Sequence, residues 1–176
     1  GKPGTITDSV FEPEALQQFA NWVSETVEPA SLPNQNQEAF IVEDSQMVLL
    51  QGPPGTGKTA GTVAPALCAR IHAAQKANTP LSGLITAPSN TAIDEMMDDV
   101  ADLIEKIQAD PDAPAGFENI NIVRLSSDPP NTVSDVVEYA DYNDEDGKQR
   151  LEELKSVLLR GSSVATDGGS AKSGAQ

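Results

Sequence analysis

Residues able to do chemistry are concentrated in one glycine-rich stretch of this 176-residue chain, Gly52 to Thr59. Its letters, GPPGTGKT, satisfy the pattern G-x-x-x-x-G-K-[ST] in full, with a compact apolar run before it and a helical pattern after it. Glycines at this spacing let successive backbone N–H groups converge on phosphate oxygens, and the following helix points the positive end of its dipole at the same anion. The stretch is a P-loop, and it predicts a site for a magnesium-complexed nucleoside triphosphate, which we expect to be ATP.

Two side chains of the P-loop carry the chemistry of this predicted site. The ammonium group of Lys58 can reach the β- and γ-phosphates, and the hydroxyl of Thr59 can ligate Mg²⁺. We therefore expect Lys58 and Thr59 to be catalytic residues, and Thr59 to be the metal ligand. The residues of this stretch expected to contact the nucleotide are Gly52, Pro53, Pro54, Gly55, Thr56, Gly57, Lys58 and Thr59. We expect no polar side-chain contact from position 60, because the residue there is Ala60 and not a second threonine.

A second polar cluster lies downstream, where Pro88, Ser89 and Asn90 end an apolar run and begin a helical pattern. Part of this pattern is helix capping, because Asn90 or Thr91 can accept the first backbone N–H groups of a helix. Ser and Asn side chains at a helix N-terminus can also hydrogen-bond a nucleic-acid phosphate without help from Lys or Arg. Pro88, Ser89 and Asn90 are therefore the candidate nucleic-acid contacts.

The elements that must position the two clusters alternate along the chain. Apolar runs predict strands at 47–50, 83–87 and 120–125, and helical spacing predicts helices at 12–28, from Asn34, at 58–77 with a kink at Pro65, and at 91–109. Beyond residue 128 we expect a short helix at 133–139, a longer one at 145–160 and a strand start at 164–166. Alternating strands and helices imply a parallel sheet built from right-handed crossovers. Ligands bind such sheets at the carboxyl ends of the strands, where both clusters fall.

The two clusters together resemble a known family. LLQGPPGTGKT followed by APSNTAIDEM is similar to motif I and motif Ia of superfamily 1 RNA/DNA helicases, specifically the branch that contains the nonsense-mediated-decay helicase. The resemblance covers residues 32–125 and implies an α/β fold, an incomplete RecA-like P-loop NTPase sheet flanked by helices. It also implies ATP and Mg²⁺ as cofactors and single-stranded RNA or DNA as partner. In the full-length enzyme, ATP hydrolysis would drive movement along that strand.

Three looser likenesses add candidates. Residues 32–39, LPNQNQEA, resemble the Q motif of this family, which implies that the Gln37 amide reads the adenine edge; an ordinary polar helix start would explain the same letters. Residues 122–125 resemble the strand with an arginine that follows motif Ia. Alternatively, they form a half-buried strand with Arg124 exposed. Residues 164–166 resemble the strand before motif II.

One part of the family's motor has no counterpart in the sequence. Hydrolysis needs an apolar strand that ends in the Asp-Glu pair of motif II, which holds Mg²⁺ and polarises the attacking water. Glu43 and Asp44 are adjacent acids, but they precede the P-loop. Because the chain also starts at Gly1 without a Met, we expect a fragment of a larger helicase, inactive alone, with the second RecA-like domain in the full-length chain. The expected domains are an N-terminal arm and helix (1–30), the RecA-like P-loop core (31–127), an acidic helical insertion (128–160), and a strand start with a flexible tail (161–176).

The charge balance, taken alone, argues against nucleic acid. The chain has 27 acidic and 11 basic residues and a formal net charge of −16, whereas nucleic-acid-binding domains usually carry a basic stripe. Two explanations stay open: a well-solvated acidic surface, or adaptation to a halophilic cell. In the second case the objection weakens, because a Debye length of about 3 Å at 1 M salt leaves only direct contacts effective.

The lengths of the apolar runs and the single cysteine bear on the cellular compartment, and the second motif bears on the competing functions. No apolar run approaches the ~20 residues of a membrane span, and the lone Cys68 cannot form an internal disulfide, so we expect a cytoplasmic protein with no membrane partner. Two alternatives to a helicase segment stay open: an AAA+ or other P-loop ATPase, and a non-catalytic nucleotide-binding module. The first is disfavoured because APSN-x-A-x-D is unusual after the second strand of AAA+ proteins. The second would be tested by the length of the parent reading frame.

Overall fold

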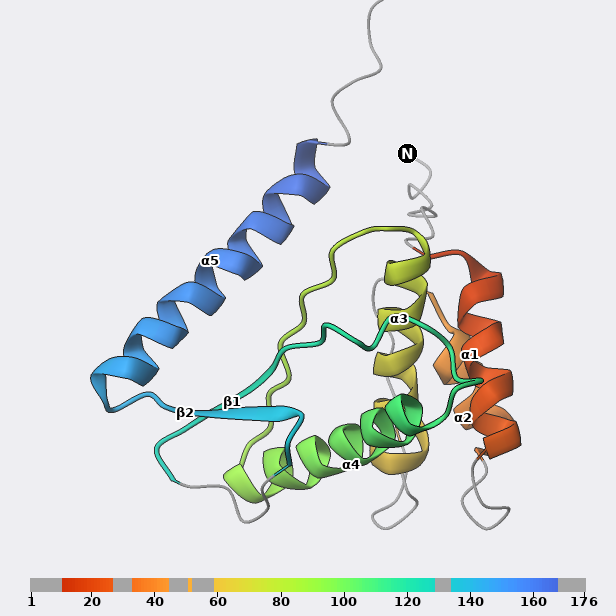
Figure 1. Ribbon diagram of the computed structural model, residues 1–176, viewed down its shortest axis with the longest axis horizontal. Coiled ribbons are helices and arrows are strands. Elements are labelled where there is room, and N and C mark those ends of the chain that lie inside the picture. Colours follow the sequence, from red (N-terminus) through yellow and green to blue (C-terminus); the bar gives the residue numbers. More distant parts are fainter. Residues whose placement is uncertain (1–10, 27–32, 45–50, 52–58, 129–133, 168–176) are drawn as a thin grey trace, which may run out of the picture. The chain divides into compact units, whose positions relative to one another are not determined.

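The computed structural model describes residues 11–26, 33–44, 51, 59–128 and 134–167 (Figure 1). The strand predicted at 47–50 and the P-loop residues 52–58 lie outside the described part of the chain. The chain divides into two compact units: unit 1 comprises residues 1–79 and 99–119, and unit 2 comprises residues 80–98 and 120–176. The described residues next to the P-loop therefore belong to unit 1, and Pro88, Ser89 and Asn90 belong to unit 2.

Unit 1 is helical. It contains α1 (Pro13–Thr26), α2 (Gln35–Val42), the π-helical turn η2 (Thr59–Val63), α3 (Ala64–Lys76) and the second half of α4 (Asn90–Ala109) (Figure 1). The helices predicted at 12–28, from Asn34 and at 91–109 are confirmed, with small differences at their ends. The acidic residues of α4 alternate with an apolar side, of which Val100, Ile104 and Ile107 are buried.

The core of unit 1 lies where α1 packs on α3. Helical spacing turns Leu16, Phe19 and Val23 of α1 inward, and none of them is more than 1% exposed. Small side chains cover the buried side of α3, so that the larger side chains of α1 fit against it: Ala66, Cys68, Ala69, Ala73 and Ala74. This part of the molecule is therefore held mainly by apolar packing.

The helix predicted at 58–77 is divided in the structure. Thr59 to Val63 form the π-helical turn η2, and α3 begins at Ala64, so Pro65 lies in the first turn of α3. Proline is well tolerated there, because the first N–H groups of a helix have no intrahelical partner. The irregularity expected at Pro65 is therefore a change from π-helical to α-helical geometry just ahead of the proline.

Unit 2 contains a small parallel sheet. Strand β1 (Ile122–Ser126) pairs with β2 (Val137–Asp141), with Ile122 opposite Val137 and Ser126 opposite Asp141. The strand predicted at 120–125 is confirmed. Helix α5 (Glu145–Asp167) follows β2 (Figure 1). It confirms the helix predicted at 145–160 and continues beyond it.

Three predicted elements are wrong. Residues 83–87 form no strand: they have no partner strand among the described residues, and Leu84 is 74% exposed. Residues 133–139 were expected as a short helix, but residues 137–141 form β2, because β-branched and aromatic side chains favour a strand once β1 offers a partner. Residues 164–166 were expected to start a strand but continue α5, since extending an existing helix costs less than starting a new element.

The described residues thus form a mixed structure of helices and strands, with one parallel two-stranded sheet. Within the described part, no helix combines the length and the apolar character that a membrane crossing requires.

Candidate nucleotide and nucleic-acid contacts

The N-terminus of α2 is closed by a capping box that involves Gln37. The side chain of Asn34 accepts hydrogen bonds from the backbone N–H groups of Asn36 and Gln37, at 3.0 and 3.1 Å. In return, Oε1 of Gln37 accepts the backbone N–H of Asn34 at 2.8 Å. The polar helix start considered for this segment is confirmed. It occupies one lone pair of the Gln37 amide oxygen and leaves the NH₂ group with no part in the cap.

The NH₂ end of Gln37 lies against η2. A Cβ built on Gly61 would be 3.2 Å from Nε2 of Gln37, so glycine at this position leaves the room that the amide occupies. Gly61 is two residues after Thr59, which is the last residue of the P-loop and the one that the structure describes. The helix cap and the turn that follows the P-loop therefore bring Gln37 next to the expected nucleotide side of unit 1.

Two hydroxyl groups of η2 have different surroundings. Thr59 is half-buried at the start of the turn. Thr62 is fully buried, and its Oγ1 has no hydrogen-bond partner among the described residues. Of the two residues, only Thr59 is partly exposed to solvent. This fits its expected role as a ligand of Mg²⁺.

Position 60 adds no polar side chain to this turn. The residue there is Ala60, which is exposed in η2 between Thr59 and Gly61. The methyl side chain of alanine can neither donate a hydrogen bond nor ligate a metal ion, so position 60 is not a contact residue.

In unit 2, Ser89 caps helix α4. Its carbonyl accepts the N–H of Ile93 at 3.2 Å, and its hydroxyl accepts the N–H of Ala92 at 3.2 Å. The sequence suggested Asn90 or Thr91 for this role, and that choice is wrong, because the chain turns into the helix one residue earlier. The side chain of Ser89 is exposed and retains its own hydroxyl hydrogen as a donor.

An ion pair links β1 to the first turns of α4. Nε of Arg124 donates to Oδ1 of Asp94 at 2.8 Å, and these side chains are only 8% and 14% exposed. Nη1 of Arg124 also donates to the carbonyl of Leu125 at 2.7 Å. The exposed arginine considered for this strand is therefore wrong. A guanidinium group carries five N–H donors, and it can be buried here because acceptors meet it on two sides.

The same guanidinium orients the side chain of Asn90. Nη2 of Arg124 donates to Oδ1 of Asn90 at 3.4 Å, and Nδ2 of Asn90 donates to Oδ2 of Asp128 at 3.1 Å. A guanidinium only donates and a carboxylate only accepts, so a single orientation of the amide satisfies both neighbours. Asn90 therefore turns its oxygen toward Arg124 and its NH₂ group toward an anion.

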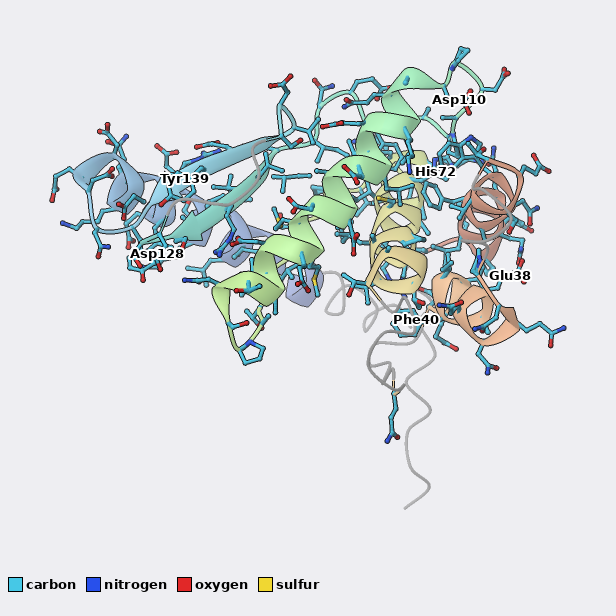
Figure 2. The ribbon with its side chains drawn as sticks, turned by 90° about the horizontal axis from the view of Figure 1, so that it is seen from below. Glu38, Phe40, His72, Asp110, Asp128 and Tyr139 are labelled. Carbon is cyan, nitrogen blue, oxygen red and sulfur yellow. The ribbon has the colours of Figure 1, made fainter. Side chains whose placement is uncertain are left out.

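Asp128 follows β1 and is labelled in Figure 2 together with Tyr139 of β2. Its backbone N–H donates to Oγ of Ser126 at 3.1 Å, and the phenol of Tyr139 on β2 donates to the carbonyl of Ser126 at 3.1 Å. Desolvation, and then the negative charges of Asp141 and Asp128, raise the pKa of Tyr139. The end of the small sheet is therefore electronegative in spite of Arg124.

Comparison with known proteins supplies the family. The family model AAA_11, described as an AAA domain, matches residues 32–161, well over half of the chain. The chain belongs to this family. It is the AAA domain of superfamily 1 helicases, so the chain carries a P-loop module of the NTPase and helicase type. No curated protein and no solved structure matched the chain.

Within this AAA domain, the predicted residues fall into two sets. Gln37 and Thr59 lie in unit 1, whereas Pro88, Ser89 and Asn90 lie in unit 2. The roles expected for the remaining P-loop residues stay predictions, because residues 52–58 lie outside the described part.

Sequence reasoning missed Asp128 at this site. Its one local signal, an Asp before two prolines at the end of an apolar run, indicates a turn and not a contact. The pairing of Asp94 with Arg124 was also missed, because the two residues come from different elements of the chain.

Proposed function

We propose that this chain is the ATP-binding segment of an ATP-dependent superfamily 1 DNA/RNA helicase, in the branch of the nonsense-mediated-decay helicase. In the full-length enzyme it would couple ATP hydrolysis to movement on single-stranded nucleic acid. The proposal combines family membership with the residues of motif I and motif Ia. The structural observation that favours it most is the Nε2 group of Gln37 against Gly61, in the turn that follows the P-loop.

On the nucleotide side, each residue has a separate task. The backbone of residues 52–57 and the ammonium group of Lys58 hold the phosphates, and the hydroxyl of Thr59 is a ligand of Mg²⁺. When bound, Mg²⁺ would neutralise part of the negative charge of the phosphates. The Nε2 group of Gln37 donates to the adenine edge. Its Oε1 keeps the cap of α2 and still has a second lone pair for the base.

On the nucleic-acid side, Pro88, Ser89 and Asn90 contact the phosphate backbone of the single strand. Ser89 offers its hydroxyl hydrogen, and Asn90 offers the NH₂ group that Arg124 holds outward. Both donors are neutral, so their binding depends little on a basic surface, which suits a chain with a formal net charge of −16. Backbone contacts of this kind fix position without reading the base sequence.

The nucleotide site is tested by binding of a fluorescent ATP analogue to the 176-residue chain in the presence of Mg²⁺. Lys58→Ala should weaken binding at least about tenfold, because it removes the direct charge on the phosphates. Lys106→Ala, on the exposed side of α4, removes the same charge elsewhere and should leave the affinity unchanged. Equal affinity of wild type and Lys58→Ala would refute the P-loop assignment.

The role of Gln37 needs a variant that keeps the helix cap. Gln37→Glu retains the oxygen that accepts the Asn34 N–H and removes the Nε2 donor. We expect the preference for ATP over GTP to fall in Gln37→Glu, with the melting temperature unchanged. Asn34→Ala is the reverse control, because it breaks the cap and leaves the Gln37 amide intact. If the preference survives Gln37→Glu, Gln37 only caps α2.

A further inference from the structure

The NH₂ group that Asn90 would offer to a phosphate is already bound to an anion. Nδ2 of Asn90 donates to Oδ2 of Asp128 at 3.1 Å, and Arg124 holds the other end of the amide. The carboxylate of Asp128 is exposed, so the contact lies where a ligand can reach it. A carboxylate and a phosphate oxygen use the same acceptor geometry toward an N–H donor.

We propose that Asp128 is an intramolecular competitor for nucleic acid: its carboxylate occupies the donor of Asn90 that a backbone phosphate of the single strand would take. This inference rests on the proposed function, in which Asn90 is a contact of the strand. Binding of the strand then requires Asp128 to move away from Asn90. Asp128 therefore lowers the affinity of the resting domain for single strands.

The charges around Asp128 strengthen this competition. Arg124 contacts Asn90, but its Nε is already paired with Asp94, so it adds little net attraction for a second anion. Asp141 and Asp144 act on the same region, since their charges are felt at Tyr139 together with that of Asp128. A phosphate that arrives at Asn90 meets both a hydrogen-bond competitor and like charge.

The geometry also explains why Asp128 can act without breaking the fold. Its side chain is exposed at the end of β1, whereas the ion pair that connects β1 to α4 uses Arg124 and Asp94. When Asp128 leaves, Arg124 still contacts Asn90, so the NH₂ group keeps its outward orientation. Asp128 is thus a removable anion on a donor that the rest of unit 2 holds in place.

The test is equilibrium binding of fluorescein-labelled oligouridylate and oligothymidylate to the intact 176-residue chain, followed by anisotropy. Asp128→Ala should tighten binding about tenfold, which corresponds to the loss of one charge-assisted competitor. Asp128→Asn keeps an acceptor for Asn90 without the charge and should give a smaller gain. Asp135→Ala removes an equal charge from an exposed position of unit 2 and should leave the affinity near that of wild type.

The double variant Asn90→Ala/Asp128→Ala separates the two proposals. If Asp128 competes for Asn90, the gain from Asp128→Ala disappears when Asn90 is replaced. A gain that persists in the Asn90→Ala background, an equal gain from Asp135→Ala, or no gain at all would each overturn the competition. By contrast, equal affinity of Asp128→Ala, Asn90→Ala/Asp128→Ala and Ser89→Ala/Asn90→Ala/Asp128→Ala would refute the nucleic-acid contact itself, because in these variants the competitor is absent.

A last arm distinguishes a strand from a free anion. Inorganic phosphate is added to the complex of Asp128→Ala with oligouridylate, at the same total phosphate concentration as the oligonucleotide. Retained binding supports a site for polymer backbone. Displacement at that concentration would assign the Asn90 donor to a small phosphate ion and would overturn the proposal. Circular dichroism of each variant verifies that the fold is unchanged.

Discussion

In unit 1 an aromatic cluster surrounds the fully buried Phe19, whose ring centroid lies 5.7 Å from that of Trp22, 6.0 Å from that of Phe117 and 6.3 Å from that of His72. His72 of this cluster is labelled in Figure 2. In unit 2 the buried residues of β1 are Arg124 and Ser126, both polar. Among the described residues of unit 2, only Met97 and Ala140 are buried apolar residues. The first unit is therefore stabilised by packing and the second by polar pairing, which is specific in direction and sensitive to the loss of one partner.

The aromatic cluster also positions two polar groups of unit 1. Nε1 of Trp22 donates to Asp110 at 2.9 Å. Nδ1 of His72 lies 2.8 Å from the carbonyl of Ala115, and since a carbonyl only accepts, this nitrogen carries the hydrogen. The remaining ring nitrogen of His72 is buried without a partner among the described residues. The polar ring atoms of Trp22 and His72 are thus held in place by the side chains that pack around Phe19.

The stability of each unit can be measured separately, because the tryptophan lies in one unit and the tyrosines lie in the other. The one Trp of the chain, Trp22, belongs to unit 1, and both Tyr residues, Tyr139 and Tyr142, belong to unit 2. Trp fluorescence therefore follows unfolding of unit 1, and ¹⁹F NMR of fluorotyrosine-labelled protein follows unit 2.

The largest expected effect is that of Phe19→Ala. Phe19 is 0% exposed, and its removal leaves a cavity among three rings, so the free energy of unfolding of unit 1 should fall by about 3–5 kcal/mol. Urea unfolding followed by Trp22 fluorescence measures it. Glu25→Ala, at an exposed position of the same helix α1, is the control and should stay within about 0.5 kcal/mol of wild type. A Phe19→Ala protein as stable as this control would mean that apolar packing does not stabilise unit 1.

The next effect is that of Arg124→Ala on unit 2. Removal of one partner leaves Asp94 poorly solvated and unpaired, and we expect a loss of about 3 kcal/mol, reduced from the fully buried case by the residual exposure of both side chains. Unfolding is followed by the fluorotyrosine signals. In the double variant Arg124→Ala/Asp94→Ala, part of the stability should return, because no charge is then left unpaired. Strictly additive losses would show that the two side chains are not coupled.

A third prediction concerns pH and the packing of unit 1. Burial raises the pKa of the Cys68 thiol from its ordinary value of 9.0 to about 12, so the folded state keeps its proton where the unfolded state loses it. The contribution of this group to the stability of unit 1 should therefore be complete below pH 9 and fall by about 1.4 kcal/mol per pH unit between pH 9 and about 12. The measurement is the difference in the pH dependence of unfolding between wild type and Cys68→Ala. Identical slopes would mean that the thiol is not buried.

The smallest effect is expected at the cap of α2. Asn34→Ala removes the acceptor of two backbone N–H groups and should cost about 1 kcal/mol of stability in unit 1. Asn36→Ala changes a neighbouring exposed amide whose side chain takes no part in the cap, and it should have little effect. Equal melting temperatures for the two variants would argue against the capping box.

Local sequence patterns predicted the helices of unit 1 well. They predicted strands less well, because a strand needs a partner from another part of the chain. The helices around Phe19 and Ile104 follow from apolar spacing, and the cap at Asn34 follows from its residue type, because both depend on neighbours within a few positions. The expected strand at 83–87 and the expected helix at 133–139 were wrong, because strand pairing joins residues that no local pattern connects.

The candidate site divides in the same way. The P-loop, Ser89 and Asn90 were found from residue types and spacing, because phosphate binding relies on glycines, hydroxyls and helix starts that are close in sequence. The partners of those residues were not found. Asp128 lies 38 positions from Asn90, and Arg124 lies 30 positions from Asp94, so only the folded chain brings them together.

By itself, the sequence determined the family and most helices of unit 1 and predicted a phosphate-binding site, because these depend on local pattern and residue type. Only the tertiary structure decided that the arginine of β1 is buried against Asp94, that Gln37 both caps α2 and faces Gly61, and that Asn90 already holds a carboxylate. The physical reason is that hydrogen bonds and ion pairs are fixed by distance in space, which separation along the chain does not encode.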